Sequence, residues 1–171
     1  MRILQGTIAL AVTLAVGALV AAVPRPLADM QIPLPQGKLI NLKSYRGKVL
    51  VVALITTECA TCIKSIDILN RMQQEFGSKG VQMVAVAGDQ NAQYVIEPFV
   101  QRYRPLFPVG YLNIEQMARL GDISPKENHN APILIFVDRK GMVRQQVFGE
   151  NPLFKTEEAS LRQLIQDMLK L

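Results

Sequence analysis

Short, uninterrupted apolar runs alternate with stretches of helical periodicity along most of this chain. The runs Val49–Ile55 and Ile133–Val137, and the segment Val81–Ala87, which Gln82 alone interrupts, are typical of strands that are buried on both faces of a sheet. Between Val49–Ile55 and Val81–Ala87, apolar side chains recur at helical spacing from Ala60 to Phe76, which predicts a helix. Gly77 follows directly and is expected to end that helix.

Shorter elements complete the pattern. It predicts extended segments at Leu39–Leu42, Phe107–Val109 and Val143–Phe148, and helices at Tyr94–Tyr103 and Ile114–Leu120. The turn Asp138–Gly141 joins the last two strands. Thr156 is expected to cap a final helix, with Glu157 and Glu158 in its first turn. A β-α-β beginning and a hairpin-plus-helix ending favour an α/β sandwich around one central sheet.

The first 23 residues differ sharply from the rest. Ile3 to Val23 carry no charge, and as a helix they are long enough to cross the roughly 30 Å hydrocarbon core of a bilayer. This segment is expected to be a transmembrane anchor or a signal peptide, and the small residues ending at Ala22 offer a cleavage site. Because Arg2 is the only charge on the short side, the N-terminus should stay in the cytoplasm while the rest is exported.

Three segments follow from this organisation: an anchor or signal peptide over residues 1–23, a proline-rich linker over 24–36, and one domain over 37–171. The domain is long enough to bury a core of its own. It is expected on the extracytoplasmic, periplasmic side of a membrane, or secreted after signal cleavage. Such compartments permit disulfide bonds.

Composition narrows the function classes. Hydrophobic residues make up 49% of the chain, which excludes a disordered protein. The net charge is +5, but no basic run is interleaved with aromatic residues, so no nucleic-acid partner is expected. A structural zinc site needs about four ligands, whereas the chain has 2 cysteines and 1 histidine.

The two cysteines, Cys59 and Cys62, stand where the first buried strand ends and the long helix begins. Unpaired amides and partial positive charge at a helix N-terminus stabilise a thiolate. Cys59 falls near the N-cap, whereas Cys62 lies one turn further, in register with Ile66 and Leu69. Cys59 is therefore expected to attack a disulfide and Cys62 to resolve the mixed disulfide.

Two other roles stay open for the pair. A structural disulfide between residues three apart closes almost no loop and would add little stability. A peroxiredoxin-like antioxidant protein would use Cys59 as its peroxidatic residue, within a Pro-x-x-x-Thr-x-x-Cys pattern. Thr56 matches that pattern, but Val52 stands where the proline is expected.

The segments LKSYRGKVLVVALITTECATC and NAPILIFVDRKGMVRQQVFG resemble the redoxin branch of the thioredoxin superfamily, the TlpA/ResA-like group related to AhpC/TSA proteins. The resemblance covers residues 37–171 and implies a thioredoxin-like three-layer sandwich with a central mixed β-sheet, preceded by the N-terminal hydrophobic helix. It also implies that Pro132 is a cis-proline facing the cysteine pair, and that Ala131 and Pro132 dock the partner's extended chain.

The same resemblance implies a thiol–disulfide oxidoreductase with no cofactor besides a redox-active Cys59–Cys62 disulfide. Its partners would be exported thiol or disulfide proteins and an upstream membrane reductant. Glu58 and Thr61 depart from the family, which usually has tryptophan before the first cysteine and often proline before the second. Both are expected to modulate the pair, and the charge of Glu58 should oppose thiolate formation.

Two further departures concern acids that relatives place near the cysteines. Ala53 and Ser65 stand at those positions here, so the sequence predicts that the proton-transfer groups of relatives are missing.

His129 lies three residues before Pro132 and indicates an alternative function, copper binding, for the cysteine pair. The layout is similar to that of the Sco copper chaperones, which combine a thioredoxin fold, a cysteine pair and a histidine before the corresponding strand. Two thiolates and an imidazole suit copper, so Cys59, Cys62 and His129 form the alternative metal site. Sco proteins separate their cysteines by three residues rather than two, and a histidine in a polar loop is most often a surface residue.

Overall fold

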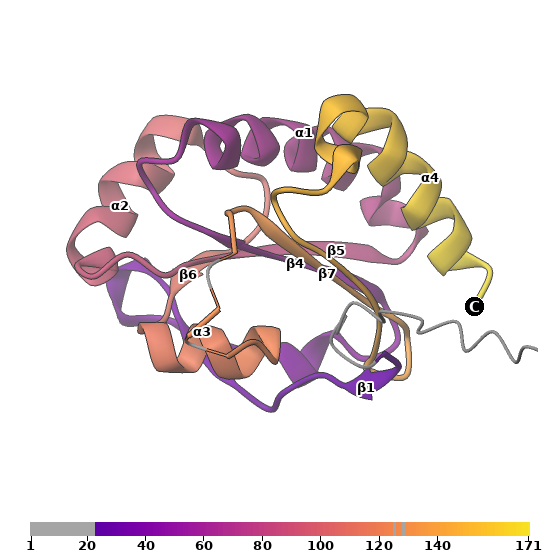
Figure 1. The fold of residues 1–171 in the computed structure, drawn as a ribbon, viewed down its shortest axis with the longest axis horizontal. Coiled ribbons are helices and arrows are strands. Elements are labelled where there is room, and N and C mark those ends of the chain that lie inside the picture. Colours follow the sequence, from indigo (N-terminus) through magenta and orange to yellow (C-terminus); the bar gives the residue numbers. More distant parts are fainter. Residues whose placement is uncertain (1–22, 125, 128) are drawn as a thin grey trace, which may run out of the picture.

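A six-stranded mixed sheet forms the centre of the protein in a computed structural model that describes residues 23–124, 126–127 and 129–171 (Figure 1). Its strands are β1 (Arg25–Pro26), β4 (Val49–Ile55), β5 (Val81–Ala87), β6 (Val109–Tyr111), β7 (Ile133–Val137) and β8 (Met142–Val147). Their order is β1-β8-β7-β4-β5-β6. β4, β5 and β6 are parallel, whereas the pairs β4–β7, β7–β8 and β8–β1 are antiparallel.

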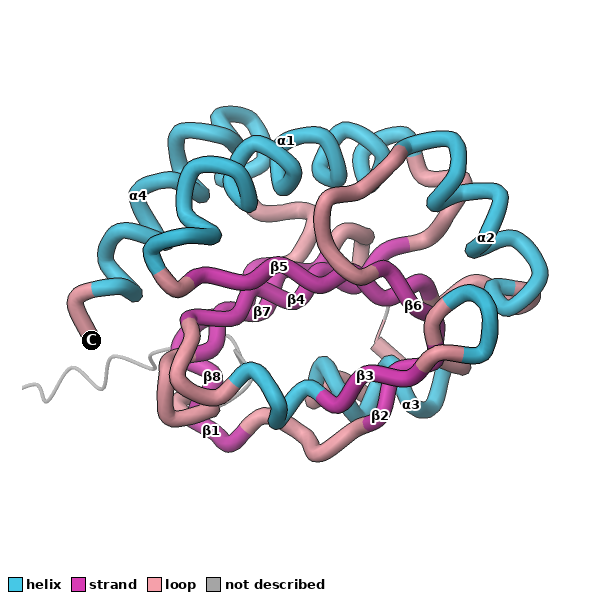
Figure 2. Tube along the Cα trace, turned by 180° about the vertical axis from the view of Figure 1, so that it is seen from behind, coloured by secondary structure: helices cyan, strands magenta, loops and turns pink. Residues whose placement is uncertain are grey.

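Helices cover both faces of this sheet. The α-helices of the described residues are α1 (Ala60–Phe76), α2 (Ala92–Tyr103), α3 (Ile114–Gly121) and α4 (Glu157–Leu169). Three of them, α1, α2 and α4, lie on one face, as Figures 1 and 2 show. The other face carries α3 and a small antiparallel sheet of β2 (Gln31–Pro33) and β3 (Leu39–Asn41). The predicted α/β sandwich with a central mixed sheet is therefore confirmed.

Short 3-10 helices join these elements. They are η1 (Pro35–Gly37), η2 (Leu42–Tyr45), η3 (Gly77–Lys79) and η4 (Pro152–Thr156).

β4 is buried along its whole length because its side chains enter two separate cores. Val51, Ala53 and Ile55 belong to the core under α1, α2 and α4. The side chains of β4 that alternate with these belong to the core under α3, on the opposite face of the sheet, and they are Leu50, Val52 and Leu54. A strand with two apolar faces has no polar positions, which is why it forms a continuous apolar run in the sequence. The bounds predicted for β4, β5 and β7 are confirmed.

α1 begins at Ala60 and ends at Phe76, as predicted. Its C-terminus differs in detail from the expectation for Gly77. That residue keeps a helical backbone, with φ of −57°, and begins η3. Gly80, with φ of +87°, adopts the left-handed conformation before β5 instead. Glycine adopts that conformation without the steric penalty of a side chain.

Other bounds differ by one or two residues. The differences are α2 from Ala92 rather than Tyr94, β6 at Val109–Tyr111 rather than Phe107–Val109, and β8 at Met142–Val147 rather than Val143–Phe148. In addition, β3 ends at Asn41 rather than Leu42, and α3 ends at Gly121 rather than Leu120. β6 is placed by its pairing with β5, where Val109 lies opposite Ala85. A pairing partner of this kind is invisible in the local apolar pattern.

Residues 24–36, predicted to be a linker, instead join the fold. β1 pairs with β8, and β2 pairs with β3. Arg25 donates a hydrogen bond to the Gln146 side chain at 2.9 Å and lies 3.3 Å from Asp122. The prolines led to the linker prediction, but proline is tolerated on an edge strand such as β1.

The predicted N-terminal hydrophobic helix lies outside the described residues. In the part of the chain that the structure describes, no helix is both long enough and apolar enough to cross a membrane. The assignment of residues 1–23 as an anchor or a signal peptide stays a prediction.

Candidate active site

The two cysteines lie at the junction of β4 and α1, as predicted. Cys59 is the N-cap residue of α1, and its Sγ accepts a hydrogen bond from the Cys62 N–H at 3.2 Å. Cys62 lies one turn further and has no exposed surface (0%). Both thiols are free, and Cys59 is partly exposed. A partner can therefore reach the sulfur of Cys59 but not that of Cys62.

The electrostatic environment separates the two sulfurs further. Burial raises the pKa of the Cys62 thiol to about 12, the interaction with Cys59 adds to the rise, and hydrogen bonds with Thr56 oppose it. Cys62 is therefore a neutral thiol near pH 7. The Cys62 N–H, one of the first-turn amides that have no partner within the helix, donates its hydrogen bond to the Cys59 sulfur.

The loop before β7 faces the pair. The peptide bond between Ala131 and Pro132 is cis, which confirms that prediction. The Cys59 Sγ lies 3.8 Å from the Ala131 carbonyl oxygen, although the two residues are 72 positions apart. The segments meet because β4 and β7 are antiparallel neighbours, with Leu54 opposite Ile133.

Asp89 holds the loop that leads into Cys59. Both oxygens of its carboxylate accept the Thr57 N–H, each at 3.0 Å. Asp89 was not predicted as a site residue, although an acidic residue shortly after a buried parallel strand is a usable signal, because such residues gather at the carboxyl edge of a sheet. The side chains of Glu58 and Thr61 are exposed beside the pair. Their effect on the cysteines stays a prediction.

His129 is oriented by carboxylates rather than by the cysteines. Its Nδ1 lies 3.3 Å from Glu150 Oε1, and its Nε2 lies 3.3 Å from Glu127 Oε2. The ring stacks on Phe148 with centroids 4.1 Å apart. Among the described residues, no three His, Cys, Asp or Glu side chains come close enough together to hold a metal ion. The alternative copper site therefore receives no support from the geometry.

A hollow of about 280 Å³ opens beside the cis-proline loop. Its wall is largely apolar and combines the end of β4, part of α3 and the loop itself, through residues that include Leu54, Thr56, Met117, His129, Ala131 and Ile133. The hollow is lined by Ala131, whose carbonyl oxygen lies 3.8 Å from the Cys59 sulfur.

A buried polar pair on α1 and α4 was also missed. Ser65, one turn after Cys62, donates a hydrogen bond to Glu157 Oε1. Neither Ser65 (0% exposed) nor Glu157 (2% exposed) reaches solvent. From its sequence position, Glu157 was predicted to be an ordinary acid in the first turn of a helix. The available signal was Ser65, a polar residue in the buried stripe of α1, since buried polar groups almost always have partners.

The fold and this site together define a class. A Cys-x-x-Cys pair begins a helix on a central mixed sheet and faces a cis-proline, in the arrangement of a thioredoxin-superfamily redoxin domain. The chain belongs to the AhpC/TSA family, whose model matches residues 23–146. The predicted family relationship is thereby confirmed.

Individual relatives agree with this assignment. Thiol-disulfide oxidoreductase ResA from Bacillus thuringiensis subsp. konkukian and from Bacillus cereus are each 27% identical over 123 residues, which cover 72% of this chain and 68% of theirs. A Chlorobium tepidum structure, assigned as a thiol:disulfide interchange protein DsbE, superposes with a TM-score of 0.73 at 25% identity, covering 85% of this chain and 96% of that chain. The predicted enzyme class, thiol–disulfide oxidoreductase, is thus the class of its relatives.

Proposed function

We propose that this chain exchanges disulfide bonds with exported proteins through Cys59 and Cys62. The observation that carries the proposal is the asymmetry of the pair. Cys59 is accessible and receives an amide hydrogen bond at a helix N-terminus, whereas Cys62 is buried and protonated. Exchange requires one sulfur that a partner can reach and a second that acts only after the first has reacted. The names of the relatives support the same activity.

The steps follow from this asymmetry. In the direction of substrate reduction, the Cys59 thiolate attacks one sulfur of a partner disulfide. A bond forms between the Cys59 sulfur and the attacked partner sulfur, and the partner's S–S bond breaks. The departing partner sulfur takes the electron pair and then a proton. Cys62 loses its proton and attacks the Cys59 sulfur, which forms the Cys59–Cys62 disulfide and releases the second partner thiol. The pair gives up two electrons, and the reverse steps oxidise a partner dithiol.

The loop at Ala131 and Pro132 is the proposed docking edge. Because the Ala131 carbonyl oxygen lies 3.8 Å from the Cys59 sulfur, a partner bonded to Cys59 must run past this loop. An extended partner segment can pair with an exposed backbone edge. The adjacent apolar hollow would then receive a side chain close to the partner's cysteine.

Trapping of mixed disulfides tests the assignment of the two sulfurs. Cys62→Ser should accumulate covalent complexes with partners that reductant dissolves, whereas Cys59→Ser and the double variant should not. A limiting amount of alkylating reagent should label Cys59 of the reduced wild type first. Preferential labelling of Cys62, together with trapping only in the Cys59 variant, would reverse the roles.

Export and membrane anchoring form the second part of the proposal. The uncharged segment of residues 3–23 supports an anchor that leaves the domain outside the cytoplasm. There, exported proteins are its partners, and a membrane reductant reduces the Cys59–Cys62 disulfide again. Fractionation and N-terminal sequencing test this. The full chain should remain with the membrane, whereas a soluble chain beginning near Val23 would eliminate the anchor and leave only export.

A further inference from the structure

Glu157 is a buried carboxyl group that the exchange steps do not use. Its Oε2 atom is buried and has no hydrogen-bond partner among the described residues. Asp138, the other buried carboxylate in the described part of the chain, accepts hydrogen bonds from Arg144 and from two backbone amides of its own turn. Of these two described carboxylates, Glu157 is the one whose negative charge would stand in the interior with one oxygen unsatisfied, a state that costs considerable free energy.

Ser65 connects this carboxyl group to the redox helix. Its hydroxyl donates to Glu157 Oε1, and Ser65 follows Cys62 by three residues in α1. Residues three apart on a helix lie on the same face, and neither Ser65 nor Cys62 has exposed surface. The thiol and the carboxyl group therefore share one buried region along α1.

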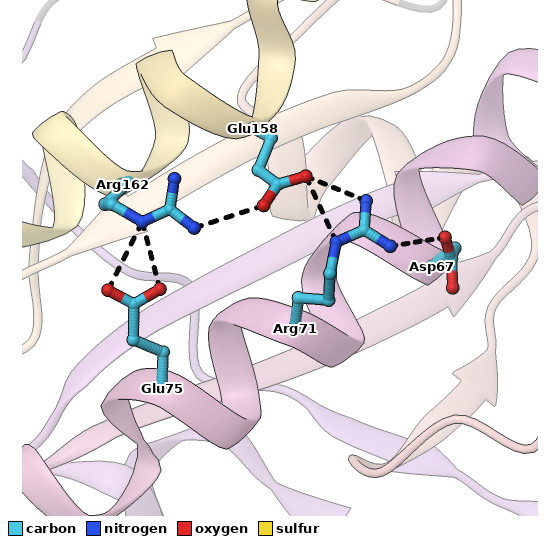
Figure 3. Close-up of polar contacts among 5 residues, drawn as sticks. All are labelled: Asp67, Arg71, Glu75, Glu158 and Arg162. Carbon is cyan, nitrogen blue, oxygen red and sulfur yellow. Dashed lines mark hydrogen bonds and ion pairs between the residues drawn. The ribbon is translucent and has the colours of Figure 1, made fainter.

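A surface network surrounds Glu158, the neighbour of Glu157. Glu158 accepts hydrogen bonds from two arginines, one on α1 and one on α4 (Figure 3). The whole network consists of Asp67, Arg71, Glu75, Glu158 and Arg162. It links the first turn of α4 to α1 at the surface, where Glu158 contacts the arginines, whereas Glu157 is buried and contacts Ser65.

The surroundings of Glu157 favour a retained proton. Burial raises its pKa, and this outweighs the hydrogen bond from Ser65 and the positive charge of Lys64 on α1, which both lower it. β4, which packs against α4, presents only apolar side chains. The preceding η4 contributes Lys155, whose side chain is exposed to solvent.

We propose that Glu157 and Ser65 form a proton-holding pair that controls the ionisation of Cys62, the resolving thiol. Glu157 acts through Cys62 rather than on the substrate, and the inference rests on the proposed function. While Glu157 is neutral, it does not oppose a thiolate at Cys62. Once Glu157 ionises, it places a second negative charge in the same low-dielectric region, and Cys62 holds its proton more tightly.

The expected size of this coupling is measurable. If the Glu157 carboxylate and the Cys62 thiolate lie on the order of 10 Å apart, at an effective permittivity of about 20, their repulsion lowers the population of the Cys62 thiolate about tenfold.

The resolving step can be followed directly with an aromatic disulfide that releases a coloured thiolate, dithiobis-nitrobenzoate, at one equivalent per reduced protein. Attack by Cys59 releases the first thiolate, and attack by Cys62 releases the second. In the wild type, the rate of the second release should rise with pH, flatten across the ionisation of Glu157 and then rise again. Glu157→Gln should match the wild type at low pH, lack the flat region, and be faster by about tenfold above it.

Two further variants separate this role from a structural one. Glu158→Gln disturbs the same turn of α4 without touching the buried carboxyl group, and it should keep the flat region. Ser65→Ala removes the hydrogen bond that lowers the pKa of Glu157. In this variant, the flat region in the pH profile of the second release should therefore move to higher pH. This second variant also keeps the test intact if Glu157→Gln fails to fold.

The outcomes are distinguishable. A ratio between Glu157→Gln and wild type that is constant with pH, or a slower variant at high pH, overturns the role of Glu157. Absence of any second release in the wild type instead refutes the proposed function itself.

Discussion

Gly149 and Asn130 are in direct backbone contact at the base of the cis-proline loop. The Gly149 N–H donates to the Asn130 carbonyl oxygen at 2.9 Å. A Cβ atom at Gly149 would lie 2.4 Å from that oxygen and 2.9 Å from the carbonyl oxygen of Ala131. No side chain fits in this space, so glycine determines how closely the chain leaving β8 approaches the loop that faces Cys59.

Gly149→Ala is expected to displace the loop and slow exchange with protein substrates. The new methyl group meets backbone atoms, which cannot rotate away, so the loop itself must move. Disulfide reductase assays with a protein substrate should show the loss mainly in kcat/KM, because docking is impaired.

Gly77→Ala is the matched control for this variant, since its new Cβ would meet only the flexible amide end of Gln73. Wild-type activity in Gly149→Ala would mean that the loop does not contribute to docking.

Asp89→Ala should loosen the loop that carries Thr57 into the active site. It removes both acceptors of the Thr57 N–H, and hydrogen bonds to charged groups contribute about 1.5–3 kcal/mol. We expect a loss of about 1–2 kcal/mol in the free energy of unfolding, measured in urea, because the site is partly open to solvent. Alkylation of Cys59 should also slow.

Asp89→Asn keeps one acceptor oxygen and should retain most of both properties, while Gln90→Ala, at an exposed neighbour, should change neither. An Asp89→Ala protein as stable and as reactive as the wild type would refute the role of this contact.

The parts of the fold that could be predicted are those whose signal is local. β4 and β7 are continuous apolar runs because each is buried on both faces, β5 is such a run apart from Gln82, and α1 carries its apolar stripe within 17 residues. The junction of β4 and α1 therefore placed Cys59 and Cys62 correctly. The cis bond at Pro132 came from the family resemblance rather than from the local pattern.

The parts that could not be predicted depend on partners far away in the chain. Ser65 and Glu157 are 92 residues apart, and Arg25 and Gln146 are 121 residues apart. A polar residue in an apolar stripe indicates that a partner exists, but it does not identify that partner. For this reason the sequence indicated only that the proton-transfer acids of relatives are missing at positions 53 and 65, whereas the fold brings the Glu157 carboxyl group from α4 to Ser65, one turn after Cys62.

The network around Glu158 should contribute little to stability and should be sensitive to salt. Its members are partly or fully exposed, and ion pairs that face solvent are screened and partly offset by the entropy of ordering long side chains. Glu158→Gln is expected to lower the melting temperature slightly at low ionic strength, and the difference should disappear at high salt.

Lys170→Gln, which breaks a single exposed pair with Asp167 in the same helix, is the control and should have an even smaller effect. A loss for Glu158→Gln that persists at high salt would mean that the network holds α4 by packing rather than by charge.

The stability of the reduced protein should fall in alkali because of Cys62. Its pKa is raised from 9.0 to about 12 in the folded state, so between these values the unfolded chain releases a proton that the folded protein retains. The contribution of this thiol to stability is complete below pH 9 and is lost as pH rises toward 12. The slope approaches about 1.4 kcal/mol per pH unit. Urea unfolding of the wild type under reducing conditions, from pH 8 to about pH 10.5, should therefore reveal a decline of up to about 2 kcal/mol from this group.

Other titrating groups contribute to the decline in every variant, so the comparison between variants is decisive. Cys62→Ala should start from a lower stability, because it leaves a small cavity, but should lack this component of the slope. Cys59→Ala removes the exposed thiol of the same site and should keep it. Equal slopes in all three proteins would show that Cys62 ionises as easily in the folded chain as in the unfolded one, and the division of roles between the two sulfurs would then rest on access alone.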